Sequence, residues 1–294
     1  MVICVATYNG ERYLRDQLDS LVNQENIDFE ILVGDDGSTD KTLDVLKEYA
    51  DLGKLTELHQ FERVGINENF LNLLKLCKDY DFVAFSDQDD IWESNKLYEL
   101  SKLLGNEKPE LAFCQRSIFV SGKRSQRPKF LNESKVGFHN ALVENVVPGN
   151  TMLLNRKAVE IIIASNISIA KYYDSYIYLL ISGLGEVKYL PATLLRYRIH
   201  EKNAVGIRKF SITGYKKAVE TYILNAQLLK SGYLAPLTAD KVKLLEEFLM
   251  GFQDKNKLRS IYRLLTIRTI RQNAVDDLVW RAITILVRLS KYPD

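Results

Sequence analysis

The 294-residue chain is 46% hydrophobic and carries 40 Lys and Arg side chains against 38 Asp and Glu. This composition is typical of an ordinary globular protein and excludes a disordered or collagen-like chain. A formal net charge of +2 is too small to indicate nucleic-acid binding, so we expect no nucleic-acid partner.

The three cysteines, Cys4, Cys77 and Cys114, are widely spaced within apolar segments. This spacing favours neither a disulfide scaffold nor a zinc site, and a reduced cytoplasmic setting fits it. No apolar run approaches the roughly 20 residues that span a bilayer, and the chain begins with a strand pattern rather than a signal sequence. We therefore expect a cytoplasmic protein.

The first part of the chain alternates between strand and helix patterns. Helical patterns begin at Gly10 and extend over 42–49 and 67–76, whereas short apolar segments predict strands at 2–6, 29–34, 55–58 and 82–85. This alternation predicts the α/β class, with a mainly parallel, Rossmann-like sheet flanked by helices. Polar motifs follow three of the strands: Thr7-Tyr8-Asn9, Asp35-Asp36-Gly37-Ser38 and Asp87-Gln88-Asp89. Because ligands of open α/β sheets bind beyond the carboxyl ends of the strands, we expect these motifs to converge.

The third motif places the carboxylates of Asp87, Asp89 and Asp90 within four residues. Their mutual repulsion is unfavourable unless water screens it or a cation neutralises it, and Mg²⁺ or Mn²⁺ prefers carboxylate oxygens. A solvated Asp-rich turn is the alternative interpretation. Three polar motifs on one sheet edge favour a site for a metal and a phosphorylated ligand.

Strand patterns return at 111–114, 117–120, 151–154 and 187–190, and helical patterns lie at 158–164 and 175–181. A polar, Pro-containing loop is predicted at 121–134. Beyond about residue 210 the pattern is helical without strands.

Together, the TYN turn, the DDGS turn and the DxD motif resemble those of the family 2 glycosyltransferases, inverting nucleotide-sugar enzymes with a GT-A domain. The variant Asp87-Gln88-Asp89-Asp90-x-Trp92 with Lys96 is similar to bacterial rhamnosyltransferases of surface polysaccharide synthesis. Further agreement comes from 148–151, 173–174, 196–200 and Asn203, whereas Arg63 departs from the Asn-x-Gly turn of many relatives. The resemblance covers about residues 2–206. It implies a GT-A catalytic domain at 1–206, with a nucleotide-binding part at about 1–105 and an acceptor part at about 106–206, followed by a helical region at 207–294.

The resemblance also implies roles for individual residues. Asp36 would accept the imide N–H of a uracil or thymine ring on which Tyr8 stacks, and Asp174 would be the general base that an inverting displacement needs. The other implied contacts are Thr7, Asn9, Asp87 and Gln88 for the nucleotide sugar, Gly149, Asn150 and Trp92 for the acceptor, and Asp89, Asp87 and His200 for Mg²⁺ or Mn²⁺.

Each of these interpretations has a structural alternative. Asp35 and Asp36 suit turn and cap chemistry, Asp174 suits a helix N-cap, and His200 suits a structural hydrogen bond. Trp92 can anchor the helix after the metal turn. An aromatic group at Tyr172, Tyr173, Tyr176 and Tyr178 suits either sugar stacking or core packing.

The C-terminal segment is basic, because residues 255–294 hold nine Lys and Arg against three Asp, a net charge of +6. Its arginines alternate with branched aliphatic residues and Trp280. This pattern indicates either contact with an anionic membrane surface or packing in a helical bundle or homo-oligomer.

We thus expect a metal-dependent inverting glycosyltransferase at the inner face of the plasma membrane. It would move a sugar, with rhamnose from dTDP-rhamnose as the leading case, to a bacterial surface glycan or lipid-linked oligosaccharide. A UDP-hexose or UDP-HexNAc transferase and a non-catalytic nucleotide-sugar or glycan-binding protein are the alternatives.

Overall fold

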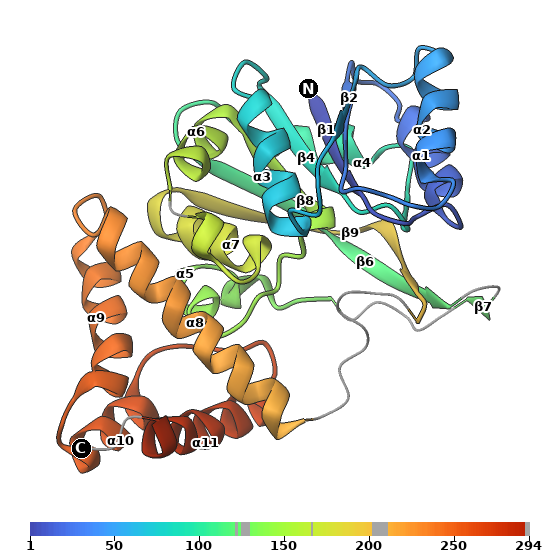
Figure 1. The fold of residues 1–294 in the computed structure, drawn as a ribbon. Coiled ribbons are helices and arrows are strands. Elements are labelled where there is room, and N and C mark those ends of the chain that lie inside the picture. Colours follow the sequence, from blue (N-terminus) through green and yellow to red (C-terminus); the bar gives the residue numbers. More distant parts are fainter. Residues whose placement is uncertain (121–122, 125–129, 166, 202–210, 292–294) are drawn as a thin grey trace. The chain divides into compact units, whose positions relative to one another are not determined.

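The computed structural model describes residues 1–120, 123–124, 130–165, 167–201 and 211–291 (Figure 1). The chain forms two compact units that alternate along the sequence. Unit 1 comprises Met1–Phe130, Val147–Ala164 and Val187–Ile207, and unit 2 comprises Leu131–Val146, Ser165–Glu186 and Arg208–Asp294. The predicted acceptor part, 106–206, therefore contributes segments to both units, and the functional division at residue 206 stays a prediction. Asn203 and half of the predicted loop at 121–134 lie outside the described residues.

Unit 1 contains the sheet and the helices that cover it. Its elements are β1 (Val2–Thr7), α1 (Leu14–Val22), β2 (Glu30–Asp35), α2 (Thr42–Asp51), β3 (Glu57–Gln60), α3 (Ile66–Leu76), β4 (Phe82–Ser86), β5 (Ile91–Trp92), α4 (Lys96–Ser101), β6 (Glu110–Val120), β7 (Lys123–Arg124), a 3-10 turn (Gly149–Thr151), β8 (Met152–Asn155), α6 (Arg156–Ala164) and β9 (Glu186–Ile199).

Within the described residues the strand order is β3-β2-β1-β4-β8-β6-β9-β5, with β7 paired to β6. The pairs from β3 to β4 are parallel, whereas β4–β8, β8–β6 and β5–β9 are antiparallel. The predicted α/β class is confirmed. Because β1, β2 and β4 run in the same direction, the residues after Thr7, Asp35 and Ser86 lie at one edge of the sheet.

Alternate residues of β1 face two different layers of helices, as the two-residue period of a strand requires. Ile3 and Val5 belong to a core that includes Leu14 and Leu18 of α1 and Leu46 of α2. On the other face, Cys4 Sγ lies 3.4 Å from Cys77 Sγ beyond the end of α3, and Phe70 packs edge-on against Phe85. Figure 1 shows α3 on the opposite side of β1 from α1 and α2.

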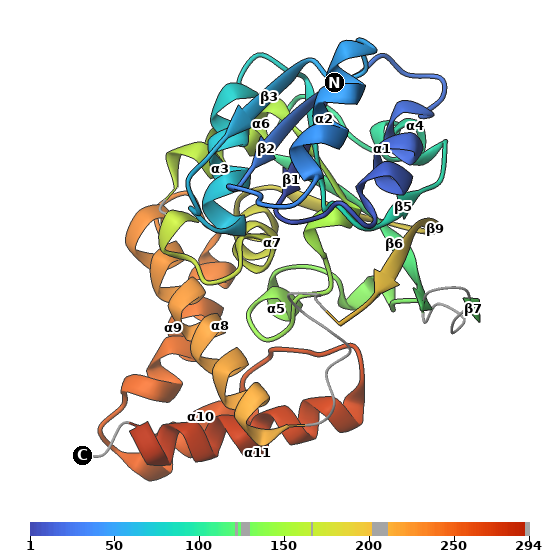
Figure 2. The same ribbon diagram turned by 45° about the vertical axis from the view of Figure 1, so that its right-hand side comes forward.

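Unit 2 is helical. Its elements are a 3-10 turn (Glu133–Lys135), α5 (Phe138–Ala141), a second 3-10 turn (Ile167–Ile169), α7 (Tyr173–Leu184), α8 (Ile212–Tyr233), α9 (Ala239–Gln253), α10 (Lys257–Thr266) and α11 (Ala274–Lys291). Successive helices from α7 to α11 pack against one another, and α11 returns to α8 (Figure 2). None of the helices in the described part of the chain is both long and apolar enough to cross a membrane.

Candidate active site

The polar motifs that follow β1, β2 and β4 meet within unit 1. The Thr7 hydroxyl donates to Asp35 Oδ2 over 2.9 Å, which joins the ends of β1 and β2. Gln88 joins the end of β4 to the same place, since its Oε1 accepts from Tyr8 N at 2.8 Å and its Nε2 donates to Tyr8 O at 3.0 Å. The predicted convergence of the three motifs is confirmed.

Asp35 holds the turn after β2 in shape. Its carboxylate is fully buried and accepts from Ser38 N at 2.9 Å and from Ser38 Oγ at 2.6 Å, in addition to Thr7. An aspartate that accepts from a backbone N–H a few residues further on stabilises a tight turn. For Asp35 the structure supports the turn-forming alternative.

The side chains of Thr7, Asn9 and Gln88, all predicted to contact the nucleotide sugar, use polar atoms within the protein. Asn9 Oδ1 accepts from Thr39 N at 2.8 Å. Gln88 approaches the backbone of Gly10 so closely that a Cβ at Gly10 would lie 2.3 Å from Gln88 Oε1. These side chains shape the turns, and their contacts with a donor stay predictions.

Asp36 lies beside a second turn, formed by 63–65. Its two carboxylate oxygens accept from Val64 N at 2.6 Å and from Gly65 N at 2.9 Å. A carboxylate has about four lone-pair sites, so Asp36 retains capacity for one further donor. Asp36 is 8% exposed, and its own N–H donates to Thr7 O at 2.9 Å.

Tyr8 is the exposed aromatic residue of this region, at 41% of its full surface. The guanidinium carbon of Arg63 lies 5.6 Å from the centre of its ring. Arg63 has a φ of +54°, in the left-handed region that asparagine tolerates better than arginine. The chain thus adopts at Arg63 the backbone conformation favoured by an Asn-x-Gly turn, although it carries a different residue there.

Asp89, which follows β4, and His200, which follows β9, form a close pair. Asp89 Oδ2 lies 2.7 Å from His200 Nε2, and the side chains retain 14% and 13% of their exposure. The imidazole also packs on Tyr13, with ring centres 4.8 Å apart. Arg198 fixes the main chain at Asp89, because its Nε donates to Asp89 O over 2.9 Å.

This pair is suited to hold part of a metal coordination shell. Carboxylate oxygen and imidazole nitrogen both bind Mn²⁺, and Mg²⁺ accepts the oxygen. Within the described ranges, no group of three or more His, Cys, Asp and Glu is placed to hold a metal ion. A cation held by this pair would need further ligands from outside the pair, and the participation of Asp87 stays a prediction.

Asp90, next to Asp89, has no exposed surface. One carboxylate oxygen accepts from Arg198 N at 3.0 Å, and the other accepts from Asn150 Nδ2. Burial, followed by the neighbouring charge of Asp89, raises the pKa of Asp90 to about 7. Asp90 therefore anchors the Asp87–Asp90 turn after β4 to β9 and to the 3-10 turn at Gly149–Thr151.

Lys96 binds the 3-10 turn at Gly149–Thr151 from the interior of the protein. Its fully buried ammonium donates to Asn150 O at 2.6 Å and lies 3.0 Å from the centre of the Trp92 ring. Burial lowers the pKa of Lys96 to about 7.

The acceptor-binding role of Trp92 and Asn150 stays a prediction, and the structure gives both side chains contacts inside the protein. Each retains 2% of its exposure, and Gly149 is buried as well. Asn150 satisfies Asp90 and Lys96, and Trp92 covers the ammonium group, so these side chains support the site from within. The role of Trp92 as an anchor for the following helix is the alternative that the structure favours.

Asp174 belongs to unit 2. Helix α7 begins at Tyr173 with Tyr172 as its N-cap, so Asp174 lies in the first turn and is not the N-cap. Its Oδ1 accepts from Ser175 N at 2.7 Å, and a carboxylate in the first turn interacts favourably with the helix dipole. Its assignment as general base stays a prediction.

The tyrosines near Asp174 serve different purposes. Tyr176 and Tyr178 are fully buried, and Tyr178 Oη accepts from Gly137 N at 2.8 Å. Core packing is thus confirmed for these two. Tyr172 and Tyr173 are only partly buried.

Residues 2–163 match the family model described as Glycosyl transferase family 2. The dTDP-rhamnosyl transferase RfbG of Shigella flexneri is 28% identical over 229 residues, which cover 72% of this chain and 77% of the relative. The UDP-Glc:alpha-D-GlcNAc-diphosphoundecaprenol beta-1,3-glucosyltransferase WfgD of Escherichia coli is 27% identical over 157 residues, or 52% of this chain and 59% of the relative.

Solved structures share the fold over nearly the whole chain. S. aureus TarS 1-349 in complex with UDP-GlcNAc aligns with a TM-score of 0.60 at 18% identity, covering 99% of this chain and 92% of that one. The mannosyltransferase PcManGT from Pyrobaculum calidifontis, in complex with GDP-Man and Mn²⁺, aligns with a TM-score of 0.57 at 14% identity, covering 99% and 86%. Because the family model matches more than half of the sequence and the curated relatives are glycosyltransferases, this chain belongs to glycosyl transferase family 2 and is a glycosyltransferase.

Proposed function

We propose that this glycosyltransferase is metal-dependent and inverts the configuration of the transferred sugar. The observation that carries the proposal is the arrangement of one sheet edge, where Asp36 and Tyr8 lie near the ends of β1 and β2 and the Asp89–His200 pair follows β4. A base-recognition site and a diphosphate-binding site would then be supplied by neighbouring strands, as in other open α/β sheets.

The nucleotide would be recognised through its base. Asp36 would accept the imide N–H of uracil or thymine with the capacity that Val64 and Gly65 leave, and the exposed ring of Tyr8 would stack on the base. Arg63 beside Tyr8 would extend this surface. Uracil and thymine offer the same imide group, so Asp36 does not distinguish dTDP from UDP donors.

The diphosphate would bind next to Asp89 and His200, with Asp87 as a further proposed ligand. A bound Mg²⁺ or Mn²⁺ would stabilise the negative charge that develops on the departing nucleoside diphosphate. Asp89 and His200 would hold that ion, while Asp90 and Arg198 keep the turn in place.

Asp174 would take the proton from the acceptor hydroxyl. The hydroxyl oxygen would form a bond to the anomeric carbon as the bond from that carbon to the diphosphate breaks, and the configuration would invert. A non-catalytic nucleotide-sugar or glycan-binding protein would have no use for this carboxylate, which favours the enzyme.

For the donor we propose dTDP-rhamnose, because the relative with 28% identity over 72% of this chain is described as a dTDP-rhamnosyl transferase. A UDP-hexose or UDP-HexNAc is the second candidate, since WfgD is described as a UDP-Glc enzyme. The acceptor would be a surface glycan or its lipid-linked precursor, which would place the enzyme in the cytoplasm at the inner face of the plasma membrane.

The test is a panel of nucleotide sugars incubated with the enzyme, a lipid-linked glycan acceptor and Mg²⁺, Mn²⁺ or EDTA. Mass spectrometry of the acceptor and NMR of the new linkage would identify the sugar and its configuration. We expect transfer from dTDP-rhamnose with inversion and no transfer in EDTA. Full activity in EDTA would refute the metal assignment, and donor binding without transfer to any acceptor would favour the binding protein.

A further inference from the structure

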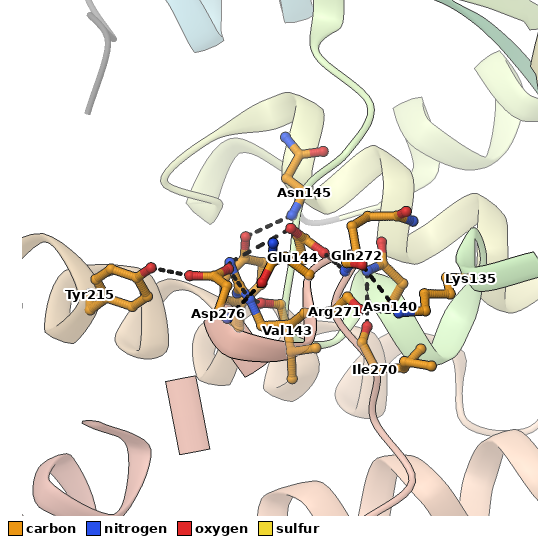
Figure 3. A network of polar contacts seen from close by, with 12 residues as sticks. Lys135, Asn140, Val143, Glu144, Asn145, Tyr215, Ile270, Arg271, Gln272 and Asp276 are labelled. Atoms are coloured by element: carbon orange, nitrogen blue, oxygen red, sulfur yellow. Dashed lines mark hydrogen bonds and ion pairs between the residues drawn. The ribbon is translucent and has the colours of Figure 1, made fainter. Parts of the chain in front are cut away.

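The sequence left the tail arginines open between membrane contact and packing, and several of them are used inside unit 2. Arg271 donates from Nε to Asp276 Oδ2 at 2.7 Å and from Nη1 to Val143 O, within the polar network of Figure 3. Arg281 donates to main-chain carbonyl groups of residues 264–269. For Arg271 and Arg281 the structure therefore supports the packing alternative.

Arg288 and Trp280 of the same pattern are buried, whereas Arg259 and Arg268 are exposed. Arg288 is 2% exposed and donates to Asp254 O at 2.6 Å and to Ser260 Oγ at 3.1 Å. Trp280 is 3% exposed and packs edge-on against Tyr222, with ring centres 5.4 Å apart. These contacts hold α11 against α10 and α8.

A different set of side chains faces solvent on α10. Leu258, Tyr262 and Leu265 are 80%, 67% and 52% exposed. Their spacing of four and three residues places them on one side of the helix. Ser260 and Leu264 occupy the opposite, buried side. Helix α10 is therefore apolar on its solvent side as well as on its core side.

Helix α11 shows the same feature. Val275, Leu278, Leu286 and Leu289 are exposed at 70%, 68%, 52% and 42%, while Ile283 and Val287 are buried. We call these four residues and the three of α10 the outer apolar face. The two helices contact each other, and Figures 1 and 2 both show them side by side in the C-terminal part of the chain.

Within residues 254–290, the charged residues that are exposed are all cationic. Residues 254–290 contain three acids, and all three form ion pairs with arginines: Asp254 with Arg259 and Arg263, Asp276 with Arg271, and Asp277 with Arg281. The exposed cationic residues of the same segment are Lys255, Lys257, Arg259 and Arg268. The exposed cations therefore lie in α10 and next to its ends, and the acids of this segment are engaged with arginines.

We propose that the outer apolar face docks this enzyme on an anionic lipid surface. Leucine, valine and tyrosine side chains at this exposure can insert at the boundary between headgroups and acyl chains, and the four cationic residues complement anionic headgroups. A second copy of the chain on the same face would bring cations against cations, which disfavours self-association. The surface lies in unit 2 and is independent of which sugar is transferred.

The experiment is flotation of the full-length protein with vesicles of phosphatidylcholine containing increasing phosphatidylglycerol, without donor or acceptor. We expect binding that rises with the anionic fraction and falls as salt is raised from about 0.1 to 0.5 M. The double variant Lys255→Glu/Arg268→Glu should weaken binding at least about 25-fold, because each cation contributes about fivefold. Leu258→Ser/Leu278→Ser should weaken it about tenfold or more by removing apolar insertion.

A matched control makes the same charge change elsewhere in unit 2. Lys217 of α8 and Lys243 of α9 are exposed, so Lys217→Glu/Lys243→Glu should leave vesicle binding within about twofold of the wild type if the outer apolar face is the contact. If the control variant loses as much vesicle binding as Lys255→Glu/Arg268→Glu, the loss follows from net charge alone and the proposal is overturned.

Sedimentation of the same variants tests the competing occupant. An oligomer that dissociates in Leu258→Ser/Leu278→Ser, together with a wild type that does not float with anionic vesicles, would assign this face to a second copy and refute lipid docking. Because no turnover is measured, these outcomes are separate from success or failure of the proposed sugar transfer.

Discussion

Lys96 offers a test of the buried contacts that support the Asp87–Asp90 turn after β4. Its ammonium is fully buried against Asn150 O and Trp92, and burial lowers its pKa to about 7. In the unfolded chain its pKa returns to about 10.5. Between these values the unfolded chain binds a proton that the folded protein has released, so the free energy of unfolding rises with pH. The slope is about 1.4 kcal/mol per pH unit, and it vanishes below pH 7, where both states are protonated.

The variant Lys96→Met keeps a long side chain and removes the titrating group. The wild type should therefore gain about 3 kcal/mol relative to Lys96→Met between pH 7.5 and 9.5. Loss of the hydrogen bond to Asn150 adds an offset that does not depend on pH. Urea unfolding followed by circular dichroism at half-unit pH intervals would measure both terms.

The exposed Lys47 of α2 supplies the control, since Lys47→Met removes a lysine from solvent. The Lys47→Met and wild-type curves should run parallel over this pH range. If the Lys96→Met and wild-type curves are parallel too, Lys96 does not titrate near neutral pH, and the described burial of its ammonium is refuted.

Three further changes test the proposed reaction. Asp89→Asn should abolish metal-stimulated transfer and weaken Mn²⁺ binding followed by electron paramagnetic resonance, and unchanged Mn²⁺ affinity would place the metal elsewhere. Asp36→Ala should raise the donor dissociation constant in calorimetry more than it lowers the chemical rate, because base recognition is made in the ground and transition states alike. Asp174→Asn should bind donor normally and lose about 10²- to 10⁴-fold in turnover, and near wild-type transfer would move the base to another carboxylate.

Local sequence patterns correctly predicted the strands and helices whose apolar residues recur at the period of the element. The strand expected at 2–6 is observed at Val2–Thr7, and the helix expected at 42–49 is observed at Thr42–Asp51. In each case the apolar residues occur at the period of the element and face one core. The motifs that follow these strands were predictable for the same reason.

Where local patterns failed, the extent of a strand depends on pairing with a segment far away in the sequence. The strand expected at 187–190 extends over Glu186–Ile199, although Pro191 and several polar residues interrupt its apolar pattern. Its far end pairs with β5, where Trp92 lies opposite Leu195. A strand that gains its hydrogen bonds from a segment about 100 residues away has little local signal. Local patterns also do not predict that segments of the two units alternate along the chain.

The surroundings of Asp89 and Asp90 could not be predicted from the sequence. Asp89 and Asp90 carry the same carboxylate, yet Asp89 pairs with His200 and Asp90 is buried beneath Arg198 N and Asn150. Which carboxylate points inward depends on donors that arrive from β9 and from Gly149–Thr151, far away in the sequence. The buried group is identified only once those segments are in place.

This difference changes the electrostatic argument for a metal. Three neighbouring carboxylates require compensation, but Asp90 obtains it within the protein, from two hydrogen-bond donors and from a pKa that burial raises to about 7. The case for Mg²⁺ or Mn²⁺ therefore depends on Asp89 and His200 rather than on the number of aspartates. A cation held by Asp89 and His200, with Asp87 as a further proposed ligand, would have few protein ligands, so its affinity should rise steeply once a nucleoside diphosphate adds phosphate oxygens. Titration of Mn²⁺ with and without UDP or dTDP would measure that coupling, and equal affinities would show that the metal and the diphosphate do not share a site.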